Sequence, residues 1–282
     1  DKNSNGDQPP HRTILILAPM SRANVITSAR NPLLKEVRRA LQKGTLTADG
    51  LCVAETFHLL EEALKSGLET PLVIAAESVR EPVERQVQGL NGVRLVTVAD
   101  EVYQEISATE AAQGVMALVR PQRWSFEHVF RGRSLVVVLD GVQDPGNAGT
   151  MVRAAEAFGS TGMLWLKGTV SPWNAKTLRA SAGSLFRVPV MEGLDAGMVR
   201  AALQQRRLDV WTAVPRGGTA AHQADLTRCC ALVIGSEGRG ISQAMDGAGQ
   251  DLHIATSGVE SLNAGVAAGV LLYEAWRQRT SA

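Results

Sequence analysis

Residues 139–159, LDGVQDPGNAGTMVRAAEAFG, constrain the fold of this chain more than any other segment. They begin at the end of an apolar run, residues 135–139, whose length predicts a buried strand. A loop rich in Gly, Pro, Asp and Asn follows, and Ala154, Ala155 and Phe158 then predict one side of a helix. A strand, loop and helix in this order place polar side chains and backbone N–H groups at the carboxyl edge of a sheet, where α/β proteins usually bind ligands.

Two later segments repeat this order. Residues 231–242, ALVIGSEGRGIS, and residues 253–276, HIATSGVESLNAGVAAGVLLYEAW, each run from an apolar strand into a turn with Gly and Ser and then into a predicted helix. The first of them has the glycine spacing GxxGxG and lies late in the chain. A dinucleotide-binding fingerprint has the spacing GxGxxG and follows a first strand, so this segment does not match it. Each segment alone is a weak signal, but the three in this order indicate one ligand site.

The length of the chain and the alternation of predicted strands and helices indicate two domains. A chain of 282 residues can bury a sizeable core. Short strands and helices alternate in both halves, which predicts a compact α/β layer and then a parallel sheet with helices on both faces. We expect a flexible leader at residues 1–20, a first domain at residues 21–120, a linker at residues 121–133 and a second domain at residues 134–282.

Apolar periodicity also places individual elements. Asn31 begins a turn before a helix that is expected to end at Gly44. A strand is predicted at residues 187–190, and a last helix is predicted at residues 262–277. The small residues of that last helix favour very close packing against a neighbour.

The predicted linker is rich in Arg and aromatic residues. With Arg120 in front, it reads RPQRWSFEHVFRGR. Such a mixture can bind RNA through phosphate contacts and stacking. An ordinary connection between domains that packs its aromatic side chains is the simpler interpretation, and both stay open.

Composition excludes some classes of protein. A net charge of +1 is nearly neutral, so charge alone does not indicate nucleic-acid binding. Cys52, Cys229 and Cys230 form neither a disulfide framework nor a metal-ligand spacing, so we interpret them as small buried residues of a protein in a reducing compartment. No apolar run reaches the roughly 18 residues that a membrane-spanning helix needs. We therefore expect a cytoplasmic protein with no metal site and no membrane partner.

The three segments together resemble the signature motifs of the SpoU/TrmH family, S-adenosylmethionine-dependent RNA ribose 2′-O-methyltransferases of the SPOUT class. The resemblance covers residues 134–276 well and the first half more loosely, as a smaller α/β, L30e-like substrate-binding domain. It implies S-adenosylmethionine as cofactor, ribosomal RNA before transfer RNA as substrate, and a homodimer formed by the catalytic domain. It also implies a C-terminal SPOUT α/β domain with a parallel sheet and a deep trefoil knot, which general rules of chain connection do not predict.

Methyl transfer to a ribose hydroxyl needs an aligned methyl donor, stabilisation of the developing alkoxide and contacts to RNA phosphates. By resemblance, Arg153 matches the arginine to which the family assigns activation of the 2′-hydroxyl. Because a guanidinium group keeps its proton at neutral pH, we expect Arg153 to bind a neighbouring phosphate and to stabilise the alkoxide. The catalytic residues that the resemblance implies are Arg153, Asn147, Glu237, Ser261 and Asn263.

The cofactor-binding residues that the resemblance implies are Thr212, Ala213, Gly235, Ser236, Glu237, Gly238, Ile254, Ala255 and Leu262. Gly235 is expected to let the cofactor approach the backbone closely, and Ser261 is also suited to cap the last helix. Residues 256–260 are one residue shorter than the usual family turn, so their alignment stays open. Glu156 is expected to pair with Arg153 or with another exposed Arg, and a plain surface carboxylate is an equal alternative.

Two other classes of protein stay open. A non-catalytic RNA-binding module could keep the same fold, although the full set of catalytic residues argues against lost activity. A nicotinamide-dependent dehydrogenase would require a glycine spacing that this chain does not have.

Overall fold

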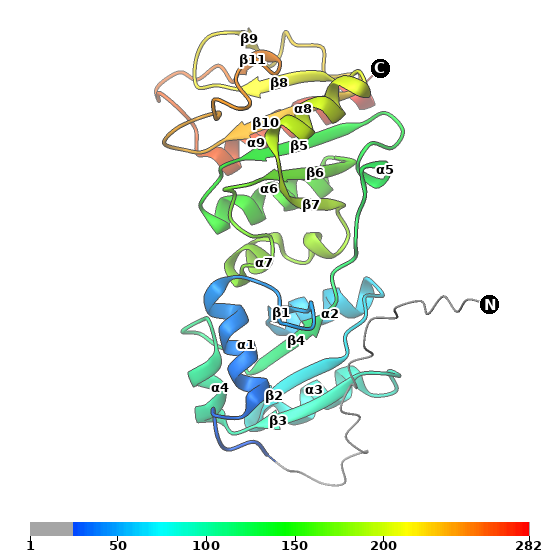
Figure 1. The fold of residues 1–282 in the computed structure, drawn as a ribbon, viewed down its shortest axis with the longest axis vertical. Coiled ribbons are helices and arrows are strands. Elements are labelled where there is room, and N and C mark those ends of the chain that lie inside the picture. The colour runs from blue at the N-terminus through cyan, green and yellow to red at the C-terminus, as the bar shows by residue number, and fades with distance from the viewer. Residues whose placement is uncertain (1–24, 282) are drawn as a thin grey trace, which may run out of the picture.

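The computed structural model describes residues 25–281, in which the strands form two separate sheets. One sheet has four strands in the order β1-β4-β2-β3, and the other has seven in the order β7-β6-β5-β10-β8-β11-β9. Figure 1 shows the sheets at opposite ends of an elongated molecule, joined by the chain between β4 and β5. The leader predicted at residues 1–20 lies outside the described residues.

The smaller sheet contains the strands of the first half of the chain. β4 pairs antiparallel with β1 and β2, and β2 pairs parallel with β3. The prediction for the first helix is confirmed, because the Asn31 side chain accepts a bond from the N–H of Leu33 at 2.9 Å and Gly44 ends the helix with a φ of +61°. The elements are α1 (Pro32–Lys43), β1 (Cys52–Glu55), α2 (Phe57–Lys65), β2 (Leu72–Ala76), α3 (Arg80–Val87), β3 (Arg94–Val98), α4 (Asp100–Ile106) and β4 (Val115–Val119).

The larger sheet is parallel throughout, as predicted. Its elements are β5 (Leu135–Asp140), α6 (Pro145–Ala157), β6 (Gly162–Leu166), α7 (Ala175–Ser181), β7 (Val190–Leu194), α8 (Ala196–Gln205), β8 (Asp209–Ala213), β9 (Thr219–Ala220), β10 (Cys230–Gly235), β11 (Gln250–His253) and α9 (Ala264–Thr280). The trefoil knot implied by the resemblance stays a prediction. None of the described helices is long and apolar enough to cross a membrane.

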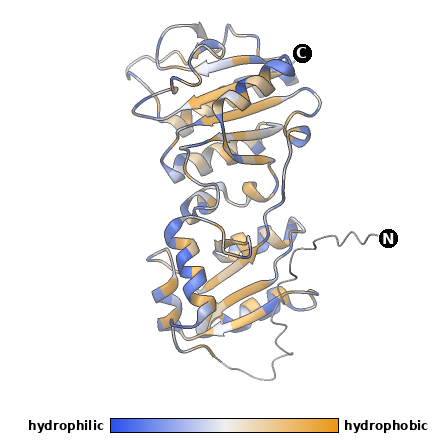
Figure 2. Ribbon diagram, viewed as in Figure 1, coloured by the Kyte–Doolittle hydropathy of each residue, from blue (hydrophilic) through white to orange (hydrophobic). Residues whose placement is uncertain are grey.

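Helices cover both faces of the larger sheet. The odd-numbered apolar residues of β5 share a cluster with α6 and α9, whereas Val136 and Val138 share another with α8 and with α5 (Phe126–Val129). All residues of β5 are buried, which explains the unbroken apolar run that a parallel strand covered on both faces requires. Figure 2 shows hydrophobic residues concentrated in the strands of both sheets.

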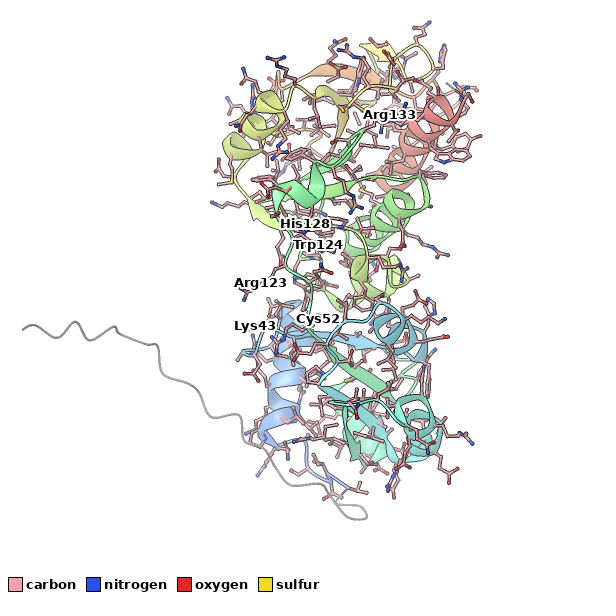
Figure 3. All side chains as sticks on the ribbon, turned by 90° about the vertical axis from the view of Figure 1, so that its right-hand side faces the viewer. Lys43, Cys52, Arg123, Trp124, His128 and Arg133 are labelled. Carbon is pink, nitrogen blue, oxygen red and sulfur yellow. The ribbon has the colours of Figure 1, made fainter. Side chains whose placement is uncertain are left out.

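The predicted linker packs its aromatic side chains. Figure 3 shows Trp124 and His128 along the connection between the two domains, and their ring centroids lie 5.3 Å apart. Phe130 is buried, and the guanidinium of Arg206 lies 5.0 Å from its ring centroid. These contacts favour a packed connection, while the exposed Arg123 leaves the RNA interpretation open.

The strand predicted at residues 187–190 is wrong. This segment instead follows a short 3₁₀ turn at Ser184–Phe186, and β7 starts only at its last residue. The N–H groups of Arg187 and Val188 bond back to the Ser184 carbonyl at 3.0 Å and 2.9 Å. Because the turn takes these donors, they are not available to a sheet ladder.

The segment at residues 231–242 is predicted to lead from a strand through a turn into a helix, and this helix is also absent from the described chain. Ser236 and Gly240 exchange backbone hydrogen bonds of 3.0 Å and 2.8 Å that close a tight turn directly after β10. Gly240 has a φ of +67°, which glycine adopts at little cost. The chain then runs without a helix to β11.

The order of the strands reverses between β5 and β10. From β5 the chain proceeds to β6 and β7 on one side, and the later strands lie on the other side. The last residues of the two strands, Asp140 and Gly235, lie opposite each other in register. Loops that leave a parallel sheet on the two sides of such a reversal diverge, and the crevice between them is a common ligand site.

Charged hydrogen bonds connect the two domains. Arg179 of α7 donates to the carboxylate of Glu55, at the end of β1, over 3.1 Å. The Glu55 side chain is only 2% exposed and also accepts from the Ser107 hydroxyl at 2.7 Å and the Ala108 N–H at 3.2 Å. A buried carboxylate with these partners fixes the orientation of β1 against α7.

A second contact uses Arg187, which pairs with Glu62 of α2 at 2.6 Å and with Glu156 of α6. The Arg187 guanidinium lowers the pKa of Glu156 below its usual value. Of the two partners expected for Glu156, the structure therefore selects another Arg and not Arg153.

Replacing Arg179 with Met should lower the free energy of unfolding by about 2 kcal/mol, because the buried Glu55 carboxylate would lose its cation. Arg38→Met is the matched control, since it breaks an exposed pair with Glu105 and should cost less than about 1 kcal/mol. Urea unfolding followed by circular dichroism measures both. Equal losses in the two variants would contradict this role of Arg179.

Candidate active site

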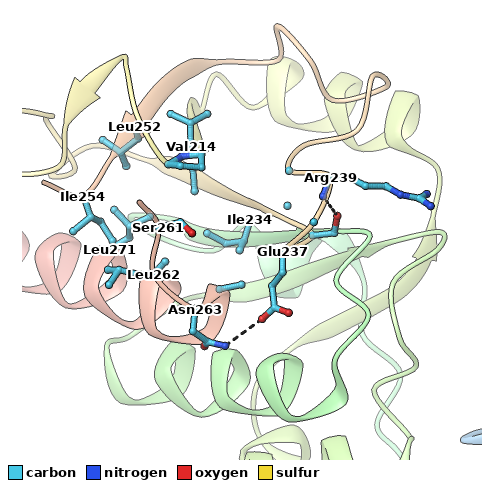
Figure 4. Close-up of a pocket in the computed structure, with 18 of the residues that line it drawn as sticks. Val214, Ile234, Glu237, Arg239, Leu252, Ile254, Ser261, Leu262, Asn263 and Leu271 are labelled. Atoms are coloured by element: carbon cyan, nitrogen blue, oxygen red, sulfur yellow. Dashed lines mark hydrogen bonds between the residues drawn. The ribbon is translucent and has the colours of Figure 1, made fainter. Parts of the chain in front are cut away.

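A cavity of about 710 Å³ opens at the carboxyl ends of β8, β10 and β11, beside the start of α9 (Figure 4). The residues expected at the cofactor that line it are Ala213, Gly235, Ser236, Glu237, Gly238, Ile254 and Leu262. Among the expected catalytic residues, Glu237, Ser261 and Asn263 line it too. Three segments that are far apart in the sequence thus meet at one hollow.

Two residues expected at the cofactor do not line this cavity. Thr212 is buried in β8, where its hydroxyl donates to the Asp251 carboxylate at 2.7 Å. Side chains alternate along a strand, so Thr212 points away from the cavity that its neighbour Ala213 lines. Ala255 lines an adjacent cavity of about 500 Å³, between the loop after β8 and the loop after β11.

The carboxylate of Glu237 joins the three segments. Its Oε1 atom accepts a hydrogen bond from the side-chain amide of Asn147. The same oxygen accepts one from the side-chain amide of Asn263 at 3.1 Å, which Figure 4 draws as a dashed line. Asn147 is held by its own backbone N–H, which donates to the Asp144 carboxylate at 2.7 Å at the start of α6. This bond lowers the pKa of Asp144, so the cap stays ionised at neutral pH.

Asn263, and not Ser261, caps the last helix. The Asn263 Oδ1 atom accepts from the N–H groups of Gly265 at 3.0 Å and Val266 at 3.2 Å. The capping role expected for Ser261 is therefore wrong, because the helix begins at Ala264, directly after Asn263. The Asn263 amide therefore has two roles: its oxygen accepts from the N–H groups at the start of α9, and its nitrogen donates to Glu237.

Gly235 is constrained by the turn that follows it. A Cβ atom at Gly235 would overlap the backbone of Gly240 and lie 2.6 Å from the N atom of Ile241. The group that lies close to Gly235 is therefore the backbone of Gly240 and Ile241, whereas the sequence led us to expect the cofactor there. The glycine permits the tight turn that carries Glu237.

Arg153 does not line the cavity. It is exposed on α6, about two helical turns after Asn147, and its side chain has no hydrogen-bond acceptor within residues 25–281. A guanidinium at this place is available to a second molecule and does not hold the cavity together.

The apolar wall of the cavity contains residues that the sequence analysis did not assign. Ile234 and Leu252 stand at the ends of β10 and β11, and Ala267 and Leu271 lie one turn apart on α9. Their positions in the sequence could have indicated them, because two are apolar residues near the ends of strands and the other two are four residues apart on one helix face. The other unassigned lining residues are Val214, Pro215, Arg239, Gly240, Thr256 and Ala264.

Two of the three cysteines belong to the core, whereas Cys229 is only half-buried, so its predicted burial is wrong. Cys52 and Cys230 are buried, and desolvation raises their pKa values to about 12 and about 11. Such thiols stay protonated at neutral pH and are poor nucleophiles. Within residues 25–281 no cluster of three or more His, Cys, Asp or Glu residues is arranged to hold a metal ion.

Comparison with known proteins identifies the class to which this fold and site belong. Residues 134–273 match the SpoU rRNA Methylase family, and residues 31–117 match the MRM3-like substrate binding domain. The chain is 30% identical to the 23S rRNA (guanosine(2553)-2′-O)-methyltransferase RlmP of Bacillus subtilis, over 88% of this chain and 97% of that protein. It is 31% identical to the 23S rRNA (guanosine-2′-O-)-methyltransferase RlmB of Xanthomonas campestris, over 80% of this chain and 91% of that protein.

Solved structures agree with this class. The AdoMet-bound rRNA methyltransferase from Sinorhizobium meliloti has a TM-score of 0.76 and 27% identity, over 90% of this chain and 97% of that one. A structure described as an RNA 2′-O ribose methyltransferase also has a TM-score of 0.76, with 30% identity over 90% of this chain and 99% of that one. This chain belongs to the SpoU rRNA methylase family.

Changing Gly235 to Ala should weaken S-adenosylmethionine binding by on the order of tenfold or more, because the added Cβ displaces the turn that carries Glu237. Gly269→Ala is the control, since nothing lies within 4 Å of its added Cβ and alanine stabilises a helix interior. Isothermal titration calorimetry measures both affinities. Unchanged affinity in Gly235→Ala would rule out the turn as part of the cofactor site.

Proposed function

We propose that this protein transfers a methyl group from S-adenosylmethionine to a ribose 2′-hydroxyl of ribosomal RNA. The observation that carries the proposal is the meeting of Asn147 and Asn263 on the Glu237 carboxylate at the edge of the cavity. Membership of the SpoU rRNA methylase family and the names of the relatives as 23S rRNA methyltransferases support it.

The cavity suits the proposed cofactor. Ile234, Leu252 and Leu271 form an apolar wall for a planar base, and the Glu237 carboxylate at the rim favours a positively charged sulfonium. When bound, S-adenosylmethionine supplies the methyl group. An S. meliloti relative of similar fold is described with AdoMet bound, which supports this choice.

Glu237 and Arg153 act on the RNA. Both amides bond to Oε1 of Glu237, and within residues 25–281 its Oε2 has no donor. Oε2 accepts the hydrogen bond of the 2′-hydroxyl, orients this oxygen and takes up its proton, and bound S-adenosylmethionine would supply the methyl group that the oxygen receives. Arg153 binds the neighbouring phosphate and stabilises the negative charge on the sugar oxygen.

The first domain binds the RNA substrate and the second performs the transfer. We assign residues 21–120 to the first domain, residues 121–133 to the linker and residues 134–282 to the catalytic domain. The match of residues 31–117 to a substrate binding domain supports this division. Since ribosomal RNA is the substrate proposed, the cytoplasm is the proposed location.

The chain forms a homodimer through α9. Val266, Val270, Tyr273 and Trp276 are large apolar residues on this helix that are 39–52% exposed. Phe158, after α6, extends the surface, with its ring centroid 5.6 Å from that of Tyr273. Contiguous exposed apolar side chains of this kind mark interaction sites, and self-association covers them.

Transfer of tritium from labelled S-adenosylmethionine to fractionated RNA tests the function. Label in the 23S rRNA fraction, located at a ribose by nuclease digestion, is the expected result. Label confined to transfer RNA would favour the second candidate, which a 30% identical putative TrmH family tRNA/rRNA methyltransferase of Staphylococcus haemolyticus suggests. Cofactor binding without transfer to any RNA would indicate a non-catalytic module.

Arg153→Ala should lower the transfer rate on the order of 100-fold while leaving S-adenosylmethionine affinity unchanged, because Arg153 lies outside the cofactor cavity. Arg153→Lys keeps the charge without the guanidinium fork and should recover part of the rate. Single-turnover kinetics and calorimetry give the two quantities. Parallel loss of rate and affinity would place Arg153 at the cofactor and contradict this role.

Tyr273→Asp should convert the dimer to a monomer, because a charge in an apolar contact between copies has no partner. Leu90→Asp is the control, since Leu90 is 43% exposed but lies in the first domain. Light scattering coupled to size-exclusion chromatography reports the mass. A monomeric wild-type protein at micromolar concentration would overturn the dimer proposal.

A further inference from the structure

A second cavity, of about 770 Å³, lies at the reversal of strand order. One wall is the loop after β5, residues 141–144, and the other is the turn after β10, residues 236–240. This turn also lines the first cavity, so the two hollows lie on opposite sides of Glu237 and Gly238. We refer to the second hollow as the switch-point groove, because crevices at such reversals commonly hold ligands in α/β proteins.

The switch-point groove combines an apolar floor with cations at its edge. Val142, Leu166 and Leu194 supply the apolar side chains. Lys167 and Arg239 are exposed at the groove, and neither side chain has a hydrogen-bond acceptor within residues 25–281. An apolar floor with unused donors around it suits a planar ring that carries hydrogen-bond acceptors.

Three of the four carboxylates at the groove, those of Asp140, Asp144 and Asp195, already accept hydrogen bonds from backbone N–H groups. Asp140 accepts from the Ser242 N–H at 2.7 Å, and Asp195 accepts from the N–H of Gly197 at 2.9 Å. Together with Asp144 and Glu237 they outnumber the two cations, so the groove disfavours a phosphate. An uncharged ring is the better fit.

We propose that the switch-point groove receives the nucleobase of the nucleotide that is methylated, turned out of the RNA strand. This inference rests on the proposed function. The base is attached to the ribose carbon next to the one that bears the 2′-oxygen, so base and reacting hydroxyl lie close together. A nucleoside that lies across Glu237 and Gly238 places its hydroxyl towards the first cavity and its base in the groove, where Lys167 and Arg239 donate to it.

Ala244→Trp tests the proposal by filling the groove, since Ala244 is an exposed residue of its wall. The variant should bind S-adenosylmethionine as the wild type does, and its kcat/KM for RNA should fall by about tenfold or more. Met198→Trp is the matched control, because Met198 is 54% exposed on α8 and does not line the groove. Lys167→Glu, which adds no side-chain volume and reverses a charge, should also lower kcat/KM.

An abasic substrate identifies what the groove holds. After the methylated position has been mapped with the wild type, an RNA with an abasic ribose at that position is compared with the intact RNA. On the abasic RNA, wild type and Ala244→Trp should have the same kcat/KM, because no base is left to be excluded. A tenfold difference that persists on abasic RNA, or no difference on intact RNA, would overturn the groove proposal. In both cases wild-type transfer leaves the proposed function standing, whereas absence of wild-type transfer to any RNA would refute the function itself.

Discussion

The site depends on one carboxylate oxygen, Oε1 of Glu237, which accepts hydrogen bonds from the amides of Asn147 and Asn263. Hydrogen bonds to an ionised acceptor are stronger than neutral ones, so this contact holds the ends of three segments together. Each amide is itself fixed by a helix start: Asp144 accepts from the Asn147 N–H, and Asn263 caps α9. Residues that shape the two helix ends therefore also set the geometry of the carboxylate.

Close packing of α6 and α9 makes that contact possible. A Cβ atom on Gly265 would lie 3.2 Å from the Asn147 side-chain oxygen and 3.5 Å from Thr150. A larger residue at Gly265 would push the helices apart and separate Asn147 from Glu237. The small residues of the last helix thus serve the site as well as the core, as their pattern in the sequence indicates.

The parallel sheet sets the division between methyl donor and proposed RNA site. Strand order reverses between β5 and β10, and the turn after β10 stands between two cavities. One cavity has an apolar wall suited to a cofactor, and the other has two cations at its edge whose side chains find no acceptor among the described residues 25–281. Ion pairs of Arg179 and Arg187 hold the first domain against α7 and α6, so this domain has a fixed place relative to these cavities.

The sequence by itself determined the two α/β layers, the parallel sheet and the three segments at its carboxyl edge, because apolar runs and Gly-rich loops are local signals. It also indicated nine of the 19 residues around the first cavity. Only the tertiary structure decided that Asn263 caps α9 in place of Ser261, that Glu156 pairs with Arg187, and that Thr212 faces away from the cavity. These choices depend on distances between elements far apart in the chain, which strand register and helix packing set and which no local pattern contains.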